Sequence, residues 1–177
     1  MKKYLADSER TASNNYFTDK VTDVEVKETF EKFSTIGETL DNQKRRLFYG
    51  KGNRLVDGDV DGFSIEGLNG NIVHAIFGLC TEAGEISEAL LKAGELGGFD
   101  EVNLKEEAGD LLWYLAMLFR ELDTDFTEVA TTNINKLKAR FPEKFTKEKA
   151  YVRDLITERK ILEDWLTEIW NPIVVSD

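Results

Sequence analysis

Only two prolines, Pro142 and Pro172, occur in this chain of 177 residues. Because proline breaks the interior of a helix, the long proline-free stretch before Pro142 leaves the chain free to form long helices. Strict alternation of apolar and polar residues, the pattern of a half-buried strand, is nearly absent. The sequence therefore predicts an all-α fold, built as a helical bundle.

The sequence predicts a short polar helix at residues 4–12. It also predicts longer helical segments with apolar faces at residues 22–48, 72–93, 101–122, 126–140 and 147–170. Gly94 is expected to end the third segment. Either Asp100 or the box Asn103-x-x-Glu106 is expected to open the fourth. Segment 50–70 is rich in glycine and aspartate, so it is predicted to be a loop.

The chain is expected to have three parts. Residues 1–70 are an N-terminal helical segment with the Gly/Asp-rich insertion, residues 71–146 are a helical core, and residues 147–177 are an amphipathic helical arm. The arm is expected to pack either on its own bundle or on a neighbouring subunit.

The composition narrows the classes of partner. The chain has 34 acidic and 23 basic residues, and this net charge of −11 argues against a nucleic-acid binder, which needs an excess of Lys and Arg. The single cysteine, Cys80, allows neither an internal disulfide nor a thiolate metal site. No apolar run approaches the roughly 18 residues of a membrane span, and the N-terminus turns acidic before a signal peptide could form. We expect a cytoplasmic protein with no nucleic-acid or membrane partner.

Two acidic pairs, Glu82-x-x-Glu85 and Glu107-x-x-Asp110, occur in the third and fourth predicted helices. Residues three apart lie on one helix face, so each pair presents two carboxylates in one direction. If the chain turns within 94–100, both pairs lie roughly 13–14 Å from the turn at about 1.5 Å per residue. Four facing carboxylates would make a hard-oxygen site for Mg²⁺ or Mn²⁺.

The alternative interpretation is a solvated acidic surface, because one E-x-x-E motif is a weak signal. Two carboxylates about 5 Å apart repel by roughly 3 kcal/mol at an effective dielectric constant near 20, so the cluster needs protons or cations. The apolar setting favours a partly enclosed site. The two helices carry the apolar residues Ile72, Val73, Ile76, Leu79, Ile86, Leu90, Leu91, Leu111, Leu112, Leu115 and Met117.

Other polar side chains are predicted to share this region. His74 lies on the face of the first acidic pair and Tyr114 on the face of the second, while Asn133, Lys136 and Arg140 form a cationic stripe on the 126–140 helix. A carboxylate–metal cluster opposite such a stripe suits a polyphosphate. The alternatives stay open: a core tyrosine, a structural histidine, and cations that complement a helix C-terminus.

Other motifs point elsewhere or are absent. The sequence has no Walker loop and no G-x-G-x-x-G, so no glycine loop cradles a phosphate. Asp57-x-Asp59-x-Asp61-Gly62 opens like a calcium loop, but Leu68 stands where the bidentate glutamate belongs, so a turn is expected. Lys44-Arg45-Arg46 is interpreted most simply as a cationic cluster at a helix C-terminus, with a patch for a substrate or a partner as the alternative.

Three stretches of sequence, taken in order, resemble the MazG-like all-α nucleoside triphosphate pyrophosphohydrolases, most closely the stand-alone phage and bacterial type. They are HAIFGLCTEAGEISE from His74, VNLKEEAGDLLWY from Val102 and NINKLKARFP from Asn133. The family pattern is E-x-x-E, a spacer and E-x-x-D, and the spacer here has a length that the family accepts. The resemblance covers residues 72–163, and the long 19–70 insertion departs from it.

The resemblance implies Mg²⁺-dependent hydrolysis of (deoxy)nucleoside triphosphates to the monophosphate and pyrophosphate. Mn²⁺ is the alternative metal, and a homodimer or homotetramer is the expected assembly. The acids that it assigns to metal binding and to activation of water are Glu82, Glu85, Glu107 and Asp110. The residues that it assigns to the substrate are Asn133, Lys136 and Arg140 for phosphate, and Tyr114 and His74 for sugar or base.

Two alternatives to this function remain. A phosphoribosyl-ATP pyrophosphohydrolase would carry the same acidic cluster, although the insertion and the tail argue against this interpretation. A non-catalytic helical interaction protein would have solvated acids and no dependence on metal.

Overall fold

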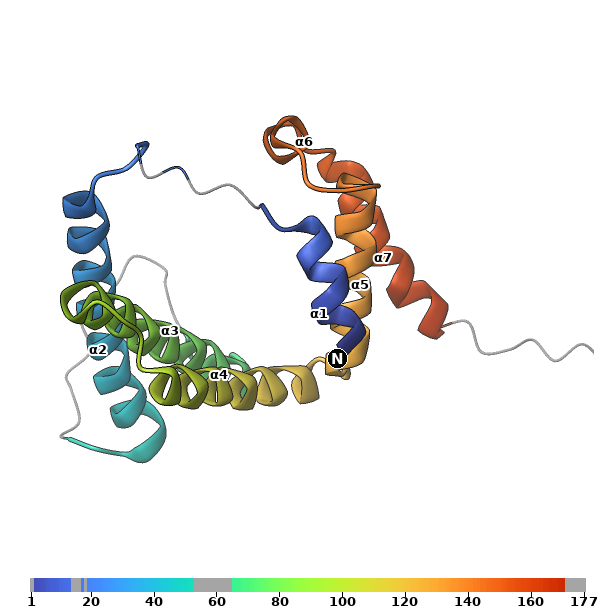
Figure 1. Ribbon diagram of the computed structural model, residues 1–177. Helices are drawn as coiled ribbons and strands as arrows, with labels where there is room; N and C mark the ends of the chain where they lie inside the picture. The colour runs from blue at the N-terminus through green and yellow to red at the C-terminus, as the bar shows by residue number, and fades with distance from the viewer. Residues whose placement is uncertain (1, 14–16, 18, 53–64, 171–177) are drawn as a thin grey trace, which may run out of the picture. The chain divides into compact units, whose positions relative to one another are not determined.

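The computed structural model describes residues 2–13, 17, 19–52 and 65–170, with side chains placed for all of these except Lys2 and residues 164–170. The described residues form seven α-helices and no strand, which confirms the all-α prediction (Figure 1). The helices are α1 Lys2–Thr11, α2 Asp23–Tyr49, α3 Gly70–Leu96, α4 Glu101–Glu121, α5 Phe126–Arg140, α6 Lys147–Tyr151 and α7 Leu155–Trp170. None of these helices is long and apolar enough to cross a membrane.

The helices form two compact units. Residues 18–123, with α2, α3 and α4, make one unit, which we call the α2–α4 unit. Residues 1–17 and 124–177, with α1, α5, α6 and α7, make the other, which we call the α5–α7 unit. This division does not coincide with the predicted parts 1–70, 71–146 and 147–177, because α1 packs with α5.

The ends of α3 and α4 follow capping chemistry. The prediction that Gly94 ends the third helix is wrong, because α3 runs on to Leu96. Gly97 takes the left-handed conformation that ends a helix (φ +79°), and its N–H donates to the Ala93 carbonyl at 2.8 Å. Of the two predicted starts for α4, Asp100 is the N-cap, since its side chain accepts from the backbone N–H groups of Val102 and Asn103.

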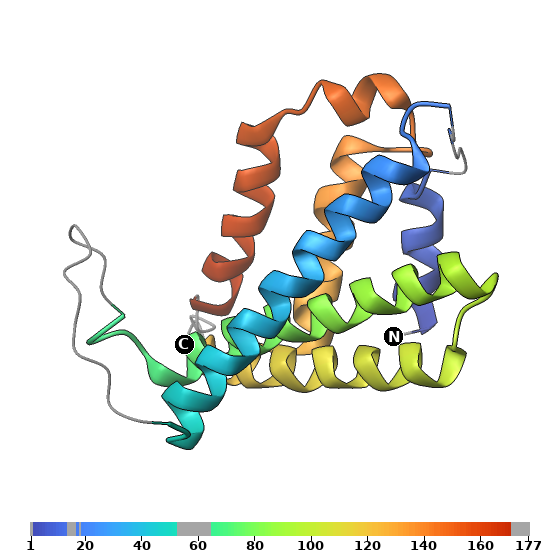
Figure 2. The same cartoon turned by 90° about the vertical axis from the view of Figure 1, so that its left-hand side faces the viewer.

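Helices α3 and α4 lie side by side and run in opposite directions, as the turn within 94–100 predicted (Figure 2). Few large side chains are buried in the α2–α4 unit. The buried apolar residues are Ala75, Ala89, Ala93, Tyr114 and Met117. Small residues let helices approach closely, so polar side chains on facing turns can meet.

Helix α2 crosses α3 at two glycines (Figure 2). A Cβ atom on Gly37 would lie 3.0 Å from the Cα atom of Gly84, so no side chain fits there without a shift. Towards the end of α2, the Phe48 ring stacks on His74 at 4.1 Å between centroids. The segment of α2 between Gly37 and Phe48 therefore lies over the acidic turn of α3.

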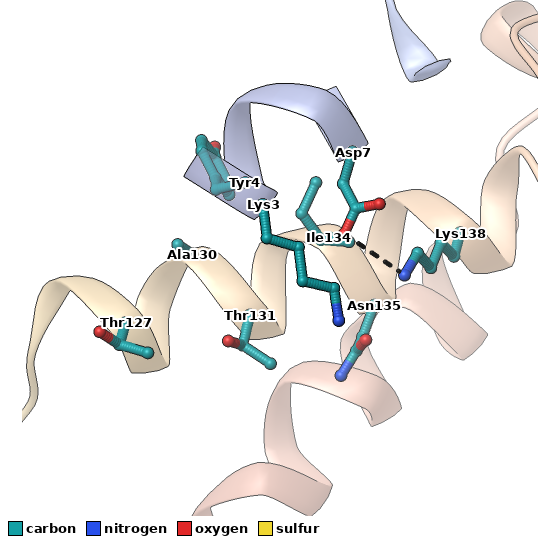
Figure 3. Close-up of a pocket in the computed structure, with 9 residues that line it drawn as sticks. All are labelled: Lys3, Tyr4, Asp7, Thr127, Ala130, Thr131, Ile134, Asn135 and Lys138. Atoms are coloured by element: carbon teal, nitrogen blue, oxygen red, sulfur yellow. Dashed lines mark ion pairs between the residues drawn. The ribbon is translucent and has the colours of Figure 1, made fainter. Parts of the chain in front are cut away.

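In the α5–α7 unit, α1 packs along α5 beside a pocket of about 180 Å³ (Figure 3). Asp7 pairs with Lys138 across it at 3.6 Å. Arg10 also joins the two elements, because its Nη1 donates to the carbonyl oxygen of Phe141 at 3.1 Å and to those of the next two residues. These bonds satisfy carbonyl groups just beyond the end of α5.

The predicted 147–170 segment forms two helices. Helix α6 ends at Tyr151, and α7 begins at Leu155 after a new cap. The Asp154 carboxylate accepts from the Thr157 N–H at 3.0 Å, which favours a fresh helix start at this point. The side chains of Trp165, Leu166 and Ile169, which suggested an amphipathic arm, lie outside the described side chains.

Candidate metal centre

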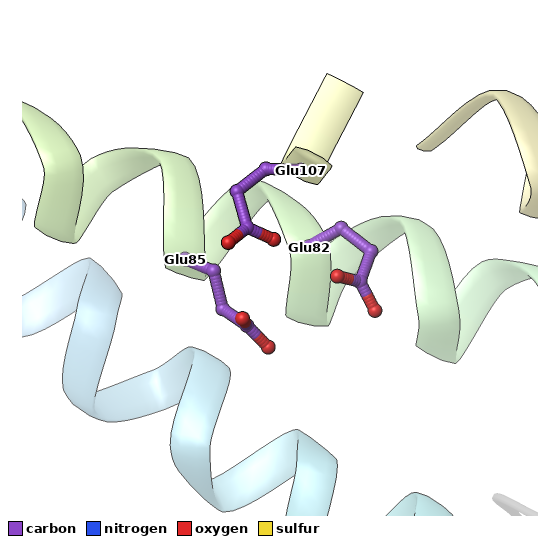
Figure 4. A group of neighbouring side chains, drawn as sticks. All are labelled: Glu82, Glu85 and Glu107. Carbon is purple, nitrogen blue, oxygen red and sulfur yellow. The ribbon is translucent and has the colours of Figure 1, made fainter. Parts of the chain in front are cut away.

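Three glutamates come together between α3 and α4. Glu82 and Glu85 project from α3 and Glu107 from α4, with their carboxylates directed into one space (Figure 4). One oxygen from each lies within 4.8 Å of the others. Glu82 and Glu107 are buried, whereas Glu85 is exposed. The i, i+3 spacing on α3 and the antiparallel arrangement of α3 and α4 produce this meeting.

The electrostatics of the cluster disfavour full ionisation. Burial, followed by the charges of Glu82 and Glu107, raises the pKa of Glu85 to about 7. Burial also raises the pKa of Glu82, and the carboxylates of Asp110 and Glu107 act in the same direction. Like charges held in a partly desolvated space raise one another's pKa unless a cation joins them.

Neighbouring groups orient the cluster. The Asn103 side-chain amide donates to a Glu107 carboxylate oxygen at 2.6 Å, and this bond fixes the carboxylate on α4. Asp110, the fourth predicted ligand, is exposed and is not one of the three acids within 4.8 Å. It is still close enough for its charge to raise the pKa of Glu82.

The donor set fits a hard divalent cation. Carboxylate oxygens are the ligands that Mg²⁺ and Mn²⁺ take, and three of them converge here. A cation among them would offset the repulsion that raises the pKa of Glu82 and Glu85. Glu82, Glu85 and Glu107 are therefore the described residues best placed to hold such an ion.

Comparison with known proteins agrees with this geometry. Residues 74–145 match the MazG nucleotide pyrophosphohydrolase domain. The chain belongs to the MazG family. The Gene 37 protein of Mycobacterium phage L5 is 38% identical over 88 residues, which cover 47% of this chain and 72% of that protein. No solved structure matches the chain.

The MazG match begins at His74 and therefore contains both acidic pairs and all of α4 and α5. Helix α2 lies outside the match, yet it contributes to the acidic cluster. Lys44 of α2 is buried, at 5% exposure, and its Nζ lies 3.7 Å from Glu82 Oε1. The interpretation of Lys44-Arg45-Arg46 as one cationic cluster at a helix end is thus wrong for Lys44.

Lys44 has three close polar partners in this position. Its Nζ donates to the Thr81 hydroxyl at 2.9 Å and to the Tyr114 hydroxyl at 3.3 Å, and it pairs with Asp41 Oδ1 at 3.2 Å. Burial disfavours the charged form, but the bonds to Tyr114 and Asp41 outweigh it and raise the pKa of Lys44. The cluster of Glu82, Glu85 and Glu107, which we call the three-glutamate cluster, therefore has one ammonium beside it, supplied by α2.

A groove between α2 and α3 leads to the cluster. It encloses about 420 Å³, and Asp41, Arg45, Thr81 and Glu85 are among the residues that line it. Since Glu85 is the exposed member of the cluster, the groove gives solvent and small molecules access to its carboxylate.

Tyr114 and His74 are packed beside the three-glutamate cluster. A Cβ atom on Gly78 would lie 2.1 Å from the Tyr114 ring, so the ring is seated directly on that glycine. His74 meets Tyr114 edge to face at 5.9 Å, and its buried Nε2 has no hydrogen-bond partner among the described residues. Burial, followed by the charge of Lys44, lowers the pKa of His74.

Asn133, Lys136 and Arg140 lie on α5, which belongs to the α5–α7 unit. Arg140 is bound there by Glu158, whose carboxylate accepts from both its Nε, at 2.7 Å, and its Nη2. It stays a prediction that this cationic stripe faces the three-glutamate cluster. The calcium-like motif at 57–62 lies outside the described residues.

Proposed function

We propose that this protein hydrolyses (deoxy)nucleoside triphosphates to the monophosphate and pyrophosphate with the help of Mg²⁺. The observation that carries the proposal is the convergence of Glu82, Glu85 and Glu107 within 4.8 Å, in a chain of the MazG family. The raised pKa values of Glu82 and Glu85 support it, because burial and the neighbouring carboxylates outweigh the one ammonium nearby and favour an added cation.

The three glutamates would hold the metal, and Asp110 at the rim of the cluster is proposed as a fourth ligand. A bound Mg²⁺ lowers the pKa of coordinated water and offsets phosphate charge. Glu85 is the acid proposed to take the proton of the attacking water, because it is exposed and lines the groove. Asn103 holds Glu107 in place by its 2.6 Å hydrogen bond.

The substrate contacts are proposed on α5 and beside the cluster. Asn133 and Lys136 are proposed to bind the phosphates, since an amide and an ammonium suit anionic oxygens. Tyr114 and His74 are proposed to border the sugar or base. Because Arg140 is already bound by Glu158, we assign it mainly a role in stabilising the α5–α7 unit. It would bind phosphate only if its ion pair with Glu158 were broken.

Assembly as a dimer or tetramer is part of the proposal. Large apolar side chains on α3 and α4 are exposed, among them Ile76, Leu112 and Trp113. Contact with a second copy would bury them, and apolar burial is the main favourable term in association. Light scattering during size-exclusion chromatography tests this, and a monomer at micromolar concentration contradicts it.

The activity is tested on purified protein with Mg²⁺ and a panel of nucleoside and deoxynucleoside triphosphates, with phosphoribosyl-ATP included. Pyrophosphate and orthophosphate are measured separately. We expect release of pyrophosphate without orthophosphate, and at least a hundredfold loss in Glu85→Gln. The matched control is Glu95→Gln, an exposed glutamate on the same helix that pairs with Lys27.

The control variant is expected to keep the wild-type rate. Absence of pyrophosphate release from every nucleotide, or equal release by wild type and Glu85→Gln, contradicts the proposed function. Equal melting curves with Mg²⁺ and with EDTA, together with no hydrolysis, would favour the non-catalytic interaction protein instead.

A further inference from the structure

Lys44 occupies an unusual position for a lysine, because it is almost fully buried beside the carboxylates proposed to hold the metal. The ammonium donates hydrogen bonds to the Thr81 and Tyr114 hydroxyls and forms an ion pair with Asp41. The fourth neighbour, Glu82 Oε1, lies at 3.7 Å, an ion-pair distance rather than a hydrogen bond. Lys44 is thus held by other groups at a short distance from a proposed metal ligand.

The crossing of α2 over α3 fixes this position. Gly37 and Gly84 bring the two helix backbones together, and Lys44 lies two turns beyond Gly37. Its ammonium is therefore built into the fold and is not free to swing into solvent. The neighbouring Arg45 behaves differently, since it is exposed and pairs with the outer oxygen of Asp41 at 2.5 Å.

The charges around Lys44 do not balance. Glu82, Glu85 and Glu107 carry three negative charges when ionised, and Asp110 adds one more nearby, whereas Arg45 offsets the charge of Asp41. One buried ammonium attracts Glu82 and reduces the repulsion within the cluster. A divalent ion bound to Glu82 would then stand close to a fixed positive charge, and like charges at short range in a partly buried site repel.

We propose that Lys44 is a resident cation that stabilises the metal-free cluster and weakens the binding of the divalent ion by competing for Glu82. This inference rests on the metal site of the proposed function. It makes Lys44 a positioning residue that holds Tyr114, Thr81 and Glu82, and it has two consequences of opposite sign. Removing the charge weakens the metal-free fold and tightens metal binding.

The test is a calorimetric titration of Mn²⁺, without nucleotide, into the wild type and Lys44→Met. The variant keeps the length of the buried chain and removes its charge. We expect Mn²⁺ to bind Lys44→Met about tenfold or more tightly, and the melting temperature in EDTA to fall. A merely structural role predicts the reverse for the metal, since a loosened site binds more weakly.

Two controls accompany this titration. Lys105→Met changes the net charge equally on α4, where the exposed lysine pairs with Glu101 at 3.4 Å, and it should leave Mn²⁺ affinity within twofold. Lys44→Arg keeps the charge and should not gain affinity. If Lys44→Met does not fold in EDTA, recovery of its helical circular dichroism with Mn²⁺ supports the proposal, and failure to recover overturns it.

Unchanged or weaker Mn²⁺ binding by Lys44→Met overturns this inference alone and leaves the proposed function standing. Binding by Lys44→Met but not by the wild type supports it in its strongest form. Absence of Mn²⁺ binding by both proteins overturns this inference together with the metal site of the proposed function.

Discussion

The two units of this protein treat a buried carboxylate in opposite ways. In the α5–α7 unit, Glu158 is 4% exposed and lies between Arg140 and Arg153, and hydrogen bonds from these arginines lower its pKa to about 2. In the α2–α4 unit, Glu82 is similarly buried, but it shares its space with other acids and its pKa is raised.

This difference distinguishes a carboxylate that only stabilises the fold, Glu158, from a group of carboxylates that needs an added cation. Two arginines satisfy Glu158 within its own unit, so nothing further has to bind there. The three-glutamate cluster has one ammonium, and burial together with the charges of Glu82 and Glu107 still raises the pKa of Glu85 to about 7. The α2–α4 unit therefore has the site that an external cation would complete.

Removing the carboxylate charge should affect the stability of the two units in opposite directions, and this is the largest effect that we expect. Glu158→Gln leaves two arginines without their carboxylate and should lower the free energy of unfolding by about 3 kcal/mol. Glu85→Gln removes one of several repelling charges, so in EDTA at pH 8 it should leave stability equal to the wild type or higher. Urea denaturation followed by circular dichroism measures both, and equal losses in the two variants would contradict the comparison.

Divalent metal should stabilise only the uncompensated site. At a hundredfold excess over its Kd, Mg²⁺ should raise the free energy of unfolding by about 2.7 kcal/mol. The gain should persist in Glu158→Gln and be lost in Glu107→Gln, which removes a buried ligand. Thermal melts with Mg²⁺ and with EDTA measure it, and a gain that survives in Glu107→Gln would place the metal elsewhere.

The Tyr114 ring packs on Gly78 beside the three-glutamate cluster, and this contact leads to a further prediction. Gly78→Ala would put a Cβ atom 2.1 Å from the ring, so the ring must move away from α3. Overpacking of this kind costs about 2 kcal/mol and should break the 3.3 Å bond from Lys44 to the Tyr114 hydroxyl. Gly94→Ala, at a glycine of the same helix with open space around it, is the matched control and should cost nothing measurable.

The pH dependence of the metal-free protein should show the smallest effect. The folded-state pKa of Glu85, about 7, lies above its unfolded value of 4.5, so the folded state binds more protons between them. Stability in EDTA should therefore fall from pH 6.5 to pH 8 as Glu85 ionises. The lowered pKa of His74 acts in the opposite direction, but below pH 6.5, and Glu158 titrates near pH 2.

Glu85→Gln is the control for this measurement. Thermal melts across the same pH range should be flatter in the variant than in the wild type. A wild-type stability that rises between pH 6.5 and pH 8, or a variant with an unchanged slope, would contradict the assignment to Glu85.

Local rules predicted the main helices and the meeting of three of the four acids. Glu82 and Glu85 share a helix face because of their spacing, and the short turn before Asp100 makes α3 and α4 antiparallel. These are short-range features that a sequence contains directly. The error at Gly94 arose because three glycines, Gly94, Gly97 and Gly98, lie near this end of the helix, and of these only Gly97 adopts the left-handed conformation.

Tertiary packing decided what the sequence did not predict. Lys44, Arg45 and Arg46 look alike in sequence, but consecutive helical residues point about 100° apart, and of the three only Lys44 is buried against α3. The signals that existed were Gly37 inside a long helix, which marks a close approach, and Asp41 three residues before Lys44. The sequence around Glu158 likewise carried no sign of its pairing with Arg140, which comes from another helix.

The most direct test of the central claim is a crystal of the protein grown with Mn²⁺ and measured for anomalous scattering. If the three glutamates hold the ion, a strong anomalous peak should lie roughly 2.0–2.3 Å from carboxylate oxygens of Glu82, Glu85 and Glu107. A structure with saturating Mn²⁺ that shows no peak among these three acids, or one in which their side chains point away from one another, would contradict it.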